Sequence, residues 1–522
     1  MAIKRYTANK DNTITNSYES DLLTRATGSN MGAADSVEVF SIYGQQASGS
    51  SELARALVQF PVDDIITDRS GSAIPSSGSV DFYLRMFNAK HPFTLPRNFT
   101  LVAAAVTQSW EEGIGLDMDE YKDTTHGVTG SDWVMAEASS GTKWGRCGGS
   151  FFTDASSTFT QHFEKGTEDL EINITPLVEQ WMNFPTANVF GHKSNYGVGI
   201  FLTSSQEAYF LGAGNTDSGS IPHNADGVQR SYYTKKFFSR TSEFFYKRPI
   251  IEARWDDSKK DDRGNFHVSS AYAYKHENLH TLWLYNSYRG RLQDIPGTED
   301  IKQIYLKLFT SASNGAALYP VGSGSFTTTT TNTVVTGGWV ETGGYSASFA
   351  LNTTASTVFD VWYYPVASGD YVFHTSSFKP IKGNAVTYNP HSSYVTTINN
   401  LKASYSNKSK EKARFRLYIR EKDWNPNIYT KARAEAPDTK IIENAYYKVT
   451  RAIDKLEVVG FGTGSSNKTG PFTRLSYDIS GNYFDFSMDL LEPGYKYNIN
   501  FLYKMPNNSF VEQEETFSFR VE

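Results

Sequence analysis

The densest group of side chains that could do chemistry is an acidic run near one tryptophan. It contains Glu111, Glu112, Asp117, Asp119, Glu120 and Asp123. Two carboxylates about 5–10 Å apart across a sugar would suit a glycosidase, and oxygen ligands on a glycine-flanked loop suit Ca²⁺. The run lacks the glycine and the distal glutamate of an EF-hand loop, and its spacing does not require a catalytic pair. We therefore predict a solvated loop, with calcium as the first alternative and a glycosidase as the last. The ligands in the calcium alternative are Asp117, Asp119, Glu120 and Asp123.

The remaining reactive side chains give no catalytic pattern. Cys147 is the single cysteine and lies beside two glycines, so we expect a structural residue with no disulfide. His276 and His280 are four residues apart, but neither a third ligand nor the HExxH order accompanies them. The glycine-rich stretches at 321–325 and 460–464 are not followed by a helix signal, which predicts turns rather than phosphate-binding loops. We expect no catalytic residue and no bound cofactor, so the chain is not expected to be an enzyme.

Strands are the elements expected to position these residues. Aromatic residues make up 14% of the chain and charged residues 20%, a bias that favours strands and turns. Residues 36–43, 483–490 and 495–502 alternate between apolar and polar types, as half-buried strands do. The best helix signal is Thr175–Asn183, with Pro176 suited to the first turn, whereas residues 442–453 fit a helix or a strand equally well. The sequence predicts an all-β fold.

Length and composition suggest three domains. A chain of 522 residues fits about three domains of ordinary size. Residues 256–264 are charged or polar without an apolar side chain, which predicts a linker. A second change in composition divides the remainder near residue 388. The predicted domains are therefore residues 1–255, 265–388 and 389–522.

Charge and hydropathy exclude several classes of partner. The formal net charge is −6, so we expect no domain to carry the extended basic surface that binds nucleic acid. The longest basic runs, Lys235-Lys236 and Lys259-Lys260, are predicted to be solvated loops. No apolar run approaches the roughly 18 residues of a membrane span, so we expect no membrane insertion. The first fifteen residues lack the apolar core of a signal peptide, so we expect no export by the usual route.

Residues 1 to about 255 carry an ordered series of eight short motifs. They are NKDNTIT from Asn9, GSNMG from Gly28, ELARALVQFPVDDI from Glu52, SWEEG from Ser109, SDWV from Ser131 followed by TKWGRCGGSF from Thr142, INITPLVEQW from Ile172, NYGVGIFL from Asn195, and FFSRTSE from Phe237 followed by RPIIEARW from Arg248. This succession resembles the DNRLRE-type β-sandwich of bacterial and archaeal surface proteins. The resemblance implies a jelly-roll-like sandwich for these residues. For the rest of the chain, the strand patterns predict two smaller antiparallel β-sandwich domains, the last Ig-like. It implies extracellular display and glycan contact, and it carries over no catalytic residues.

The aromatic and arginine residues of these motifs are expected to be structural. A tryptophan can bury about 150–250 Å², and an arginine in an apolar setting needs a buried partner. The tryptophans in question are Trp110, Trp133, Trp144 and Trp181. Arg55 and Arg240 are the corresponding arginines, and Glu243 is one expected partner. Packing at the core and corners of a sandwich is the role we predict for all of them.

Two features together suggest a viral particle. Such modules normally follow a signal peptide, but the first fifteen residues here lack the apolar core of one. A phage assembles its particles inside the host cytoplasm, so its proteins need no such signal. Residues 389–522, with Leu417–Asn427 as the clearest stretch, resemble virion structural proteins of contractile-tailed marine cyanophages. We expect a non-enzymatic phage virion protein of the tail, baseplate, neck, fibre or capsid decoration. Its expected partners are other virion proteins, further copies of itself and a host-surface glycan. A bacterial carbohydrate-binding or adhesion protein is the alternative.

Overall fold

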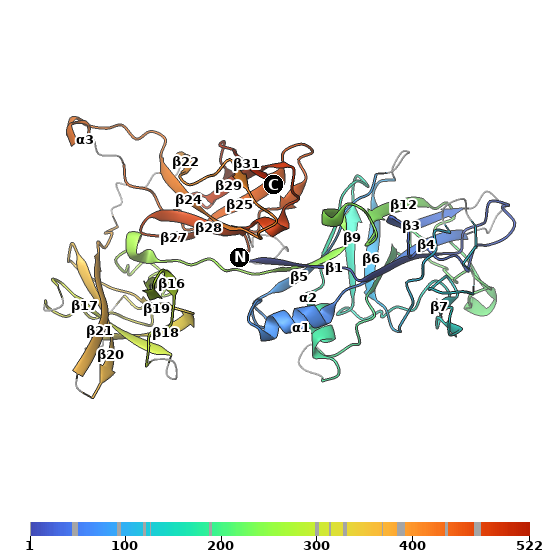
Figure 1. The fold of residues 1–522 in the computed structure, drawn as a ribbon, viewed down its shortest axis with the longest axis horizontal. Coiled ribbons are helices and arrows are strands. Elements are labelled where there is room, and N and C mark those ends of the chain that lie inside the picture. Colours follow the sequence, from blue (N-terminus) through green and yellow to red (C-terminus); the bar gives the residue numbers. More distant parts are fainter. Residues whose placement is uncertain are drawn as a thin grey trace. The chain divides into compact units, whose positions relative to one another are not determined.

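The chain folds into two compact units, shown as a ribbon in Figure 1. The structure is a computed structural model that describes residues 2–43, 51–90, 96–117, 122–125, 127–186, 191–297, 302–312, 315–326, 331–367, 369–383, 392–433, 437–463 and 471–522. Unit 1 comprises Asp257–Thr463 and Thr473–Glu522, and unit 2 comprises Ala2–Asp256 and Gly464–Phe472. Strands dominate both units, which confirms the predicted all-β class. No described helix has the length and apolar character needed to cross a membrane.

Unit 2 is a sandwich of two sheets. The four-stranded sheet has the order β1 (Ile3–Thr7), β13 (Ile250–Arg254), β5 (Asp81–Met86) and β10 (Leu170–Asn173). The other has the order β12 (Tyr232–Phe238), β3 (Ser36–Tyr43), β4 (Ser51–Gln59), β11 (Val198–Leu202), β6 (Phe99–Ala105) and β9 (Thr158–Phe163), and β2 (Lys10–Thr15) also pairs with β4. Consecutive strands such as β1 and β2, or β5 and β6, lie in different sheets, as in a jelly roll.

The core of unit 2 lies between its two sheets. Phe82 from the four-stranded sheet and Phe99 from the seven-stranded sheet are both fully buried in it. Helices α1 (Val62–Ser70) and α2 (Thr175–Asn183) pack against each other and contribute Ile65 and Trp181 to the same core. Helix α2 has the bounds predicted from its sequence, with Pro176 in the first turn.

A second apolar cluster covers the outer face of the seven-stranded sheet. Because side chains alternate along a strand, β4 sends Ala56 and Val58 into the central core and Leu53 and Leu57 to this outer cluster. The cluster also contains Ile14, Val106, Trp110, Trp133, Ala136 and Trp144. Arg55 shares the outward side of β4 with Leu53 and Leu57. The loops after β6, including the hairpin β7 (Met135–Glu137) and β8 (Thr142–Lys143), therefore pack on this face of the sheet.

Unit 1 contains one six-stranded sheet and a pair of sheets near the C-terminus. The six-stranded sheet has the order β14 (His280–Tyr285), β19 (Gly344–Phe349), β18 (Val334–Glu341), β17 (Gln303–Phe309), β20 (Val358–Val366) and β21 (Gly369–Phe378), around a core that includes Trp362. One sheet of the C-terminal pair has the order β22 (Tyr394–Ile398), β24 (Lys412–Glu421), β28 (Gly481–Ser487) and β27 (Ser476–Asp478). The other has the order β23 (Ser404–Tyr405), β31 (Phe517–Val521), β29 (Lys496–Lys504), β25 (Ala445–Arg451) and β26 (Glu457–Val459). Strand β30 (Phe510–Glu512) pairs antiparallel with the end of β29, and α3 (Ile428–Arg433) lies in the connection after β24.

The charged stretch after Trp255 is packed within unit 1. Asp261 and Asp262 are buried, and Asp262 begins a short 3-10 helix, η4 (Asp262–Gly264). The Asp262 carboxylate accepts hydrogen bonds from the Tyr477 hydroxyl, at 2.6 Å, and from the backbone N–H of Thr281, at 2.7 Å. Burial raises the pKa of Asp261 to about 6. This stretch therefore ties strand β14 to strand β27.

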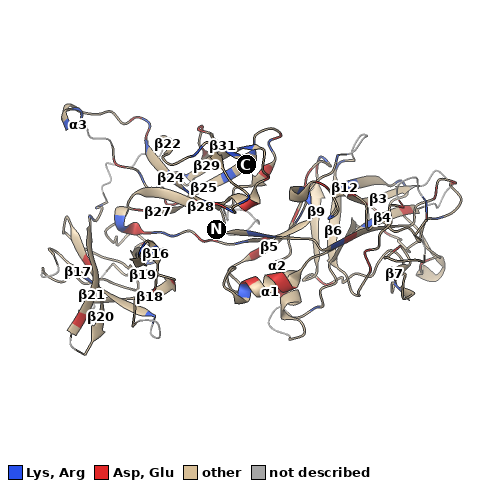
Figure 2. Ribbon diagram, in the orientation of Figure 1, with Lys and Arg blue, Asp and Glu red and all other residues tan. Residues whose placement is uncertain are grey.

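Charges of both signs are interspersed along the chain (Figure 2). One of them departs from the sequence-based expectation. Lys235 was predicted to lie in a solvated loop, but it is fully buried in β12. Its ammonium group donates to Asn88 Oδ1 and to the carbonyls of Gly166 and Glu168, at 2.6, 2.8 and 2.7 Å. A buried lysine is tolerated here because three oxygens replace its water.

Candidate functional site

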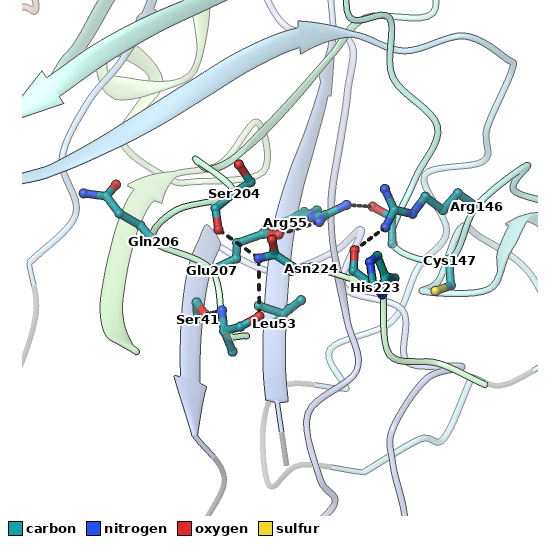
Figure 3. Close-up of polar contacts among 12 residues, drawn as sticks. Ser41, Leu53, Arg55, Arg146, Cys147, Ser204, Gln206, Glu207, His223 and Asn224 are labelled. Carbon is teal, nitrogen blue, oxygen red and sulfur yellow. Dashed lines mark hydrogen bonds and ion pairs between the residues drawn. The ribbon is translucent and has the colours of Figure 1, made fainter. Parts of the chain in front are cut away.

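Arg55 is the centre of a buried polar cluster in unit 2. Its guanidinium donates to Glu207 Oε1 and Oε2, at 3.1 and 2.8 Å, and to the Gly148 carbonyl, at 2.9 Å. The guanidinium also lies over the rings of Trp133 and Phe201, 5.5 and 5.2 Å from their centroids. Arginine suits this position because its planar fork binds a carboxylate with two hydrogen bonds and stacks on aromatic faces. Figure 3 shows Arg55 beside Glu207.

The loop that reaches Arg55 depends on two glycines in succession. Gly148 and Gly149 have φ of +81° and +97°, a region that L side chains rarely adopt. A Cβ at Gly148 would lie 2.7 Å from the Trp133 ring. This turn places Phe151 on β11, where its ring stacks on Phe201 with centroids 4.8 Å apart. The Gly-Gly-Ser-Phe motif is therefore explained by the close approach of this loop to the sheet.

A second arginine holds the rim of the site. Arg146 binds Asp217, with 3.0 Å between Nη2 and Oδ1, and its Nη2 also donates to the His223 carbonyl at 2.8 Å. Hydrogen bonds, first from Arg146, keep the pKa of Asp217 below its usual value despite partial burial. Burial raises the pKa of the neighbouring Cys147 thiol to about 11, so this thiol remains protonated at neutral pH. His223 Nδ1 accepts from the Gly212 N–H at 3.1 Å, which makes Nε2 the protonated nitrogen of the neutral ring.

Arg55, Arg146, Glu207 and His223 line a cleft of about 630 Å³. Phe151, Phe152 and Phe201 form its apolar wall. The polar lining comes from Ser150, Thr153, Thr158, Thr203, Ser204, His223 and Asn224, together with the two arginines and Glu207. Ligand pockets of this size combine an apolar surface with a few polar groups that fix orientation. Aromatic rings beside hydroxyl and amide groups suit a neutral, hydroxyl-rich ligand such as a sugar, which has an apolar ring face and polar edges.

The predicted structural tryptophans are buried, and the two predicted arginines each bind a carboxylate. Trp110, Trp133 and Trp144 lie together in the outer cluster, whereas Trp181 belongs to the central core. Arg240 binds Glu112, with both hydrogen bonds at 2.8 Å. Arg55 has a buried partner, Glu207, whereas Arg240 is half-buried. Glu112 binds Arg240 in place of the expected partner Glu243, which is exposed.

The acidic run provides no metal centre among its described members. The Asp117 carboxylate accepts from the backbone N–H of Asn30, at 3.0 Å, and from the hydroxyls of Thr124 and Thr125. Asp123 Oδ2 accepts from the Gly28 N–H at 3.2 Å. Asp119 and Glu120 lie outside the described residues. Within the described ranges, no group of three His, Cys, Asp or Glu side chains could hold a metal ion.

Sequence reasoning missed the residues that bind Arg55 and Arg146. Glu207, Asp217 and His223 all lie between β11 and β12, in a stretch of about thirty residues without a strand-like alternation. Their partners, Arg55 and Arg146, come from segments that were singled out for packing. Nothing in the spacing of the sequence pairs them, because each pair joins residues more than 70 positions apart.

Comparison with known proteins adds little to this geometry. No protein-family model and no curated protein matches the chain. The solved structures that match include the titin domains z1z2 in complex with telethonin, at 11% sequence identity. That similarity covers 49% of this chain and 90% of the titin chain, with a TM-score of 0.13.

Proposed function

We propose that this protein is a non-enzymatic structural component of a phage particle, acting through assembly with other virion proteins and with copies of itself. The observation that supports this proposal is the use of the motif residues in unit 2. Arg55, Trp133 and Gly148 meet in one packing arrangement, and Arg240 is bound to Glu112. The residues that carry the resemblance to a display-type β-sandwich thus build the sandwich and its loops.

The titratable groups of the cleft support a binding rather than a catalytic role. Both oxygens of Glu207 accept from Arg55, and Asp217 is bound by Arg146. A general base near neutral pH usually has a raised pKa and a free lone pair for its substrate. A carboxylate that accepts hydrogen bonds from an arginine instead has its oxygens occupied and is fixed in position.

The decisive experiment is to look for the protein in purified virions. We expect mass spectrometry of the particles to find the full chain at a fixed copy number per particle, and immunogold labelling to place it at one structural position. Neighbouring tail or capsid genes would agree with this assignment. Absence of the protein from purified particles would refute the proposal.

Carbohydrate binding is the second candidate, and the lining of the 630 Å³ cleft favours it. Ser204→Trp should fill the cleft and abolish any signal on a glycan array, because Ser204 is an exposed lining residue. Ser205→Trp, at the next position and outside the lining, is the matched control. Binding without loss of polymer mass would identify a binder, whereas shortening of the polymer would identify an enzyme.

A further inference from the structure

The two edges of the six-stranded sheet in unit 1 have different surroundings. At one edge, β14 is covered by the stretch before it: Thr281 donates its backbone N–H to Asp262, and Trp283 Nε1 donates to the Lys260 carbonyl at 3.0 Å. At the other edge, β21 pairs with β20. Within the described part of the chain, no hydrogen bond from another segment reaches the β21 backbone. One edge is therefore protected and the other is open.

Strand β21 has the composition of a strand that pairs on both sides. It spans ten residues, Gly369–Phe378, and the eight residues Tyr371–Phe378 contain no Asp, Glu, Lys, Arg or Pro, with His374 as their one titratable imidazole. Tyrosine, valine, phenylalanine and threonine favour strands. Open edges in monomeric proteins are usually guarded by lysine, proline or short length, because an unguarded edge pairs with another chain. β21 has a single bulge, opposite Trp362 and Tyr363, and no guarding side chain between Asp370 and Lys379.

The exposure of the side chains along β21 also indicates an unprotected edge strand. Of its ten residues only Phe378 is buried, whereas a strand that packs one face on a core alternates. Tyr371 and Val372 are 61% and 49% exposed, and Val366 on the paired strand β20 is 46% exposed. The β20–β21 hairpin, near the lower left of Figure 1, therefore presents apolar side chains together with unpaired backbone groups.

We propose that β21 is a self-association strand, which pairs antiparallel with β21 of a second copy of this chain across a two-fold axis. The charges at its ends favour this occupant and this direction. Asp370 lies at the start of β21, where its carboxylate also binds Lys307 of the same subunit at 2.5 Å, and Lys379 follows the last residue of the strand. An antiparallel pair brings each Asp370 near Lys379 of the partner subunit, whereas a parallel pair sets like charges side by side, which destabilises a sheet.

The covered edge explains why this association stops at two copies. An isologous contact uses the same strand on both subunits and closes on itself. The opposite edge, β14, is already bonded to the stretch around Asp262. A dimer thus forms one continuous sheet across both subunits without open-ended growth. Assembly in a particle would strengthen this contact through multivalency, but the pairing itself does not depend on the proposed virion role.

The test is the oligomeric state of the full chain in solution. We expect sedimentation equilibrium to show a reversible monomer–dimer equilibrium for the wild type. Thr375→Lys should raise the dissociation constant at least about tenfold, because it places two lysines near the two-fold axis. Thr375 is exposed, so the variant's free energy of unfolding should equal that of the wild type. Val340→Lys is the matched control, since Val340 is 49% exposed on β18, an interior strand of the same sheet, and we expect its dissociation constant to equal that of the wild type.

Cysteine cross-linking keeps the test independent of the lysine variant. His374→Cys lies near the centre of β21, so oxidation should yield a covalent dimer on a non-reducing gel. Val340→Cys should run as a monomer on the same gel, because it forms no covalent cross-link. Cys147 is present in every variant and gives the background level of cross-linking. A wild type that is monomeric at its highest soluble concentration would overturn the proposal. So would a dimer that Thr375→Lys leaves intact. Either result leaves the virion assignment to be decided by the particle analysis.

Discussion

At the scale of single residues, two adjacent lysines of β12 have opposite surroundings. Lys235 is fully buried between the rings of Phe163 and Phe237, at 5.0 and 5.1 Å. Lys236 reaches the surface, where it binds Glu38 at 2.8 Å. The sequence treats the two alike, and only the register of β12 against β3 separates them. Burial lowers the pKa of Lys235 to about 8, which still leaves it largely protonated at neutral pH.

Replacement of these two lysines should have very different effects on stability. Lys235→Met leaves three buried oxygens without their donor, so we expect the free energy of unfolding to fall by at least about 2 kcal/mol. Lys236→Met removes one surface ion pair and should cost less than about 1 kcal/mol. Urea unfolding at pH 7 measures both. Equal losses for the two variants would contradict the assignment of Lys235 to the core.

The Asp11 carboxyl predicts a pH dependence of stability. Burial, with a contribution from nearby Glu112, raises its pKa from 3.8 to about 7. A folded-state pKa above the unfolded value means that the stabilising contribution is complete below about pH 4 and is lost as the pH rises through 7. Asp11→Asn keeps an oxygen that can accept from the Arg240 N–H. Relative to wild type, its free energy of unfolding should therefore rise between about pH 4 and pH 8, as measured by urea titration.

Asp226→Asn provides the control for that experiment, because Asp226 lies exposed on a turn. It removes a carboxylate from the surface without changing a buried site. A difference between Asp11→Asn and wild type that stays constant over the whole pH range would show that Asp11 titrates normally.

At the scale of elements, the sequence predicted what depends on local pattern. Strand β3 and helix α2 have the predicted bounds, Ser36–Tyr43 and Thr175–Asn183, because alternation and an initial proline are local signals. Residues 442–453 were ambiguous, and the structure has strand β25 there, since Val449 is buried in its sheet. Helix α1 was not predicted, although Pro61 stands immediately before it and could have marked its start. The partners of Arg55 and Arg240 depend on tertiary packing that no local pattern specifies.

Gly199 tests how β11 positions the wall of the cleft. A Cβ at this residue would lie 2.0 Å from the Phe151 ring, so Gly199→Ala forces that ring away from Phe201. We expect a loss of about 1–3 kcal/mol in the free energy of unfolding, as overpacking usually costs. Gly322→Ala, where an added Cβ would meet no atom within 4 Å, should cost less than about 1 kcal/mol. Full retention of stability in Gly199→Ala would show that Phe151 is free to move.

At the scale of the whole molecule, the chain order does not coincide with the compact units. The sequence was divided at residues 255, 264 and 388, by changes in composition. The structure assigns Gly464–Phe472 to the same unit as Ala2–Asp256, and Phe472 lies over the Arg254 guanidinium at 4.7 Å. The sequence predicted only turns at residues 460–464, where this stretch begins. A contact more than 200 residues distant along the chain depends on packing that such patterns do not encode.

Two compact units with separate cores should unfold as separate cooperative transitions. Lys235→Met acts in unit 2. Arg263→Met acts in unit 1, where it leaves buried Asp360 without its ion-pair partner at 2.7 Å and should cost about 3–5 kcal/mol. For units of this size, about 1 kcal/mol lowers Tm by roughly 2–4 °C. Differential scanning calorimetry of the full chain should therefore show two transitions, with each variant lowering a different one. A single transition that both variants lower together would show instead that the two units unfold as one cooperative body.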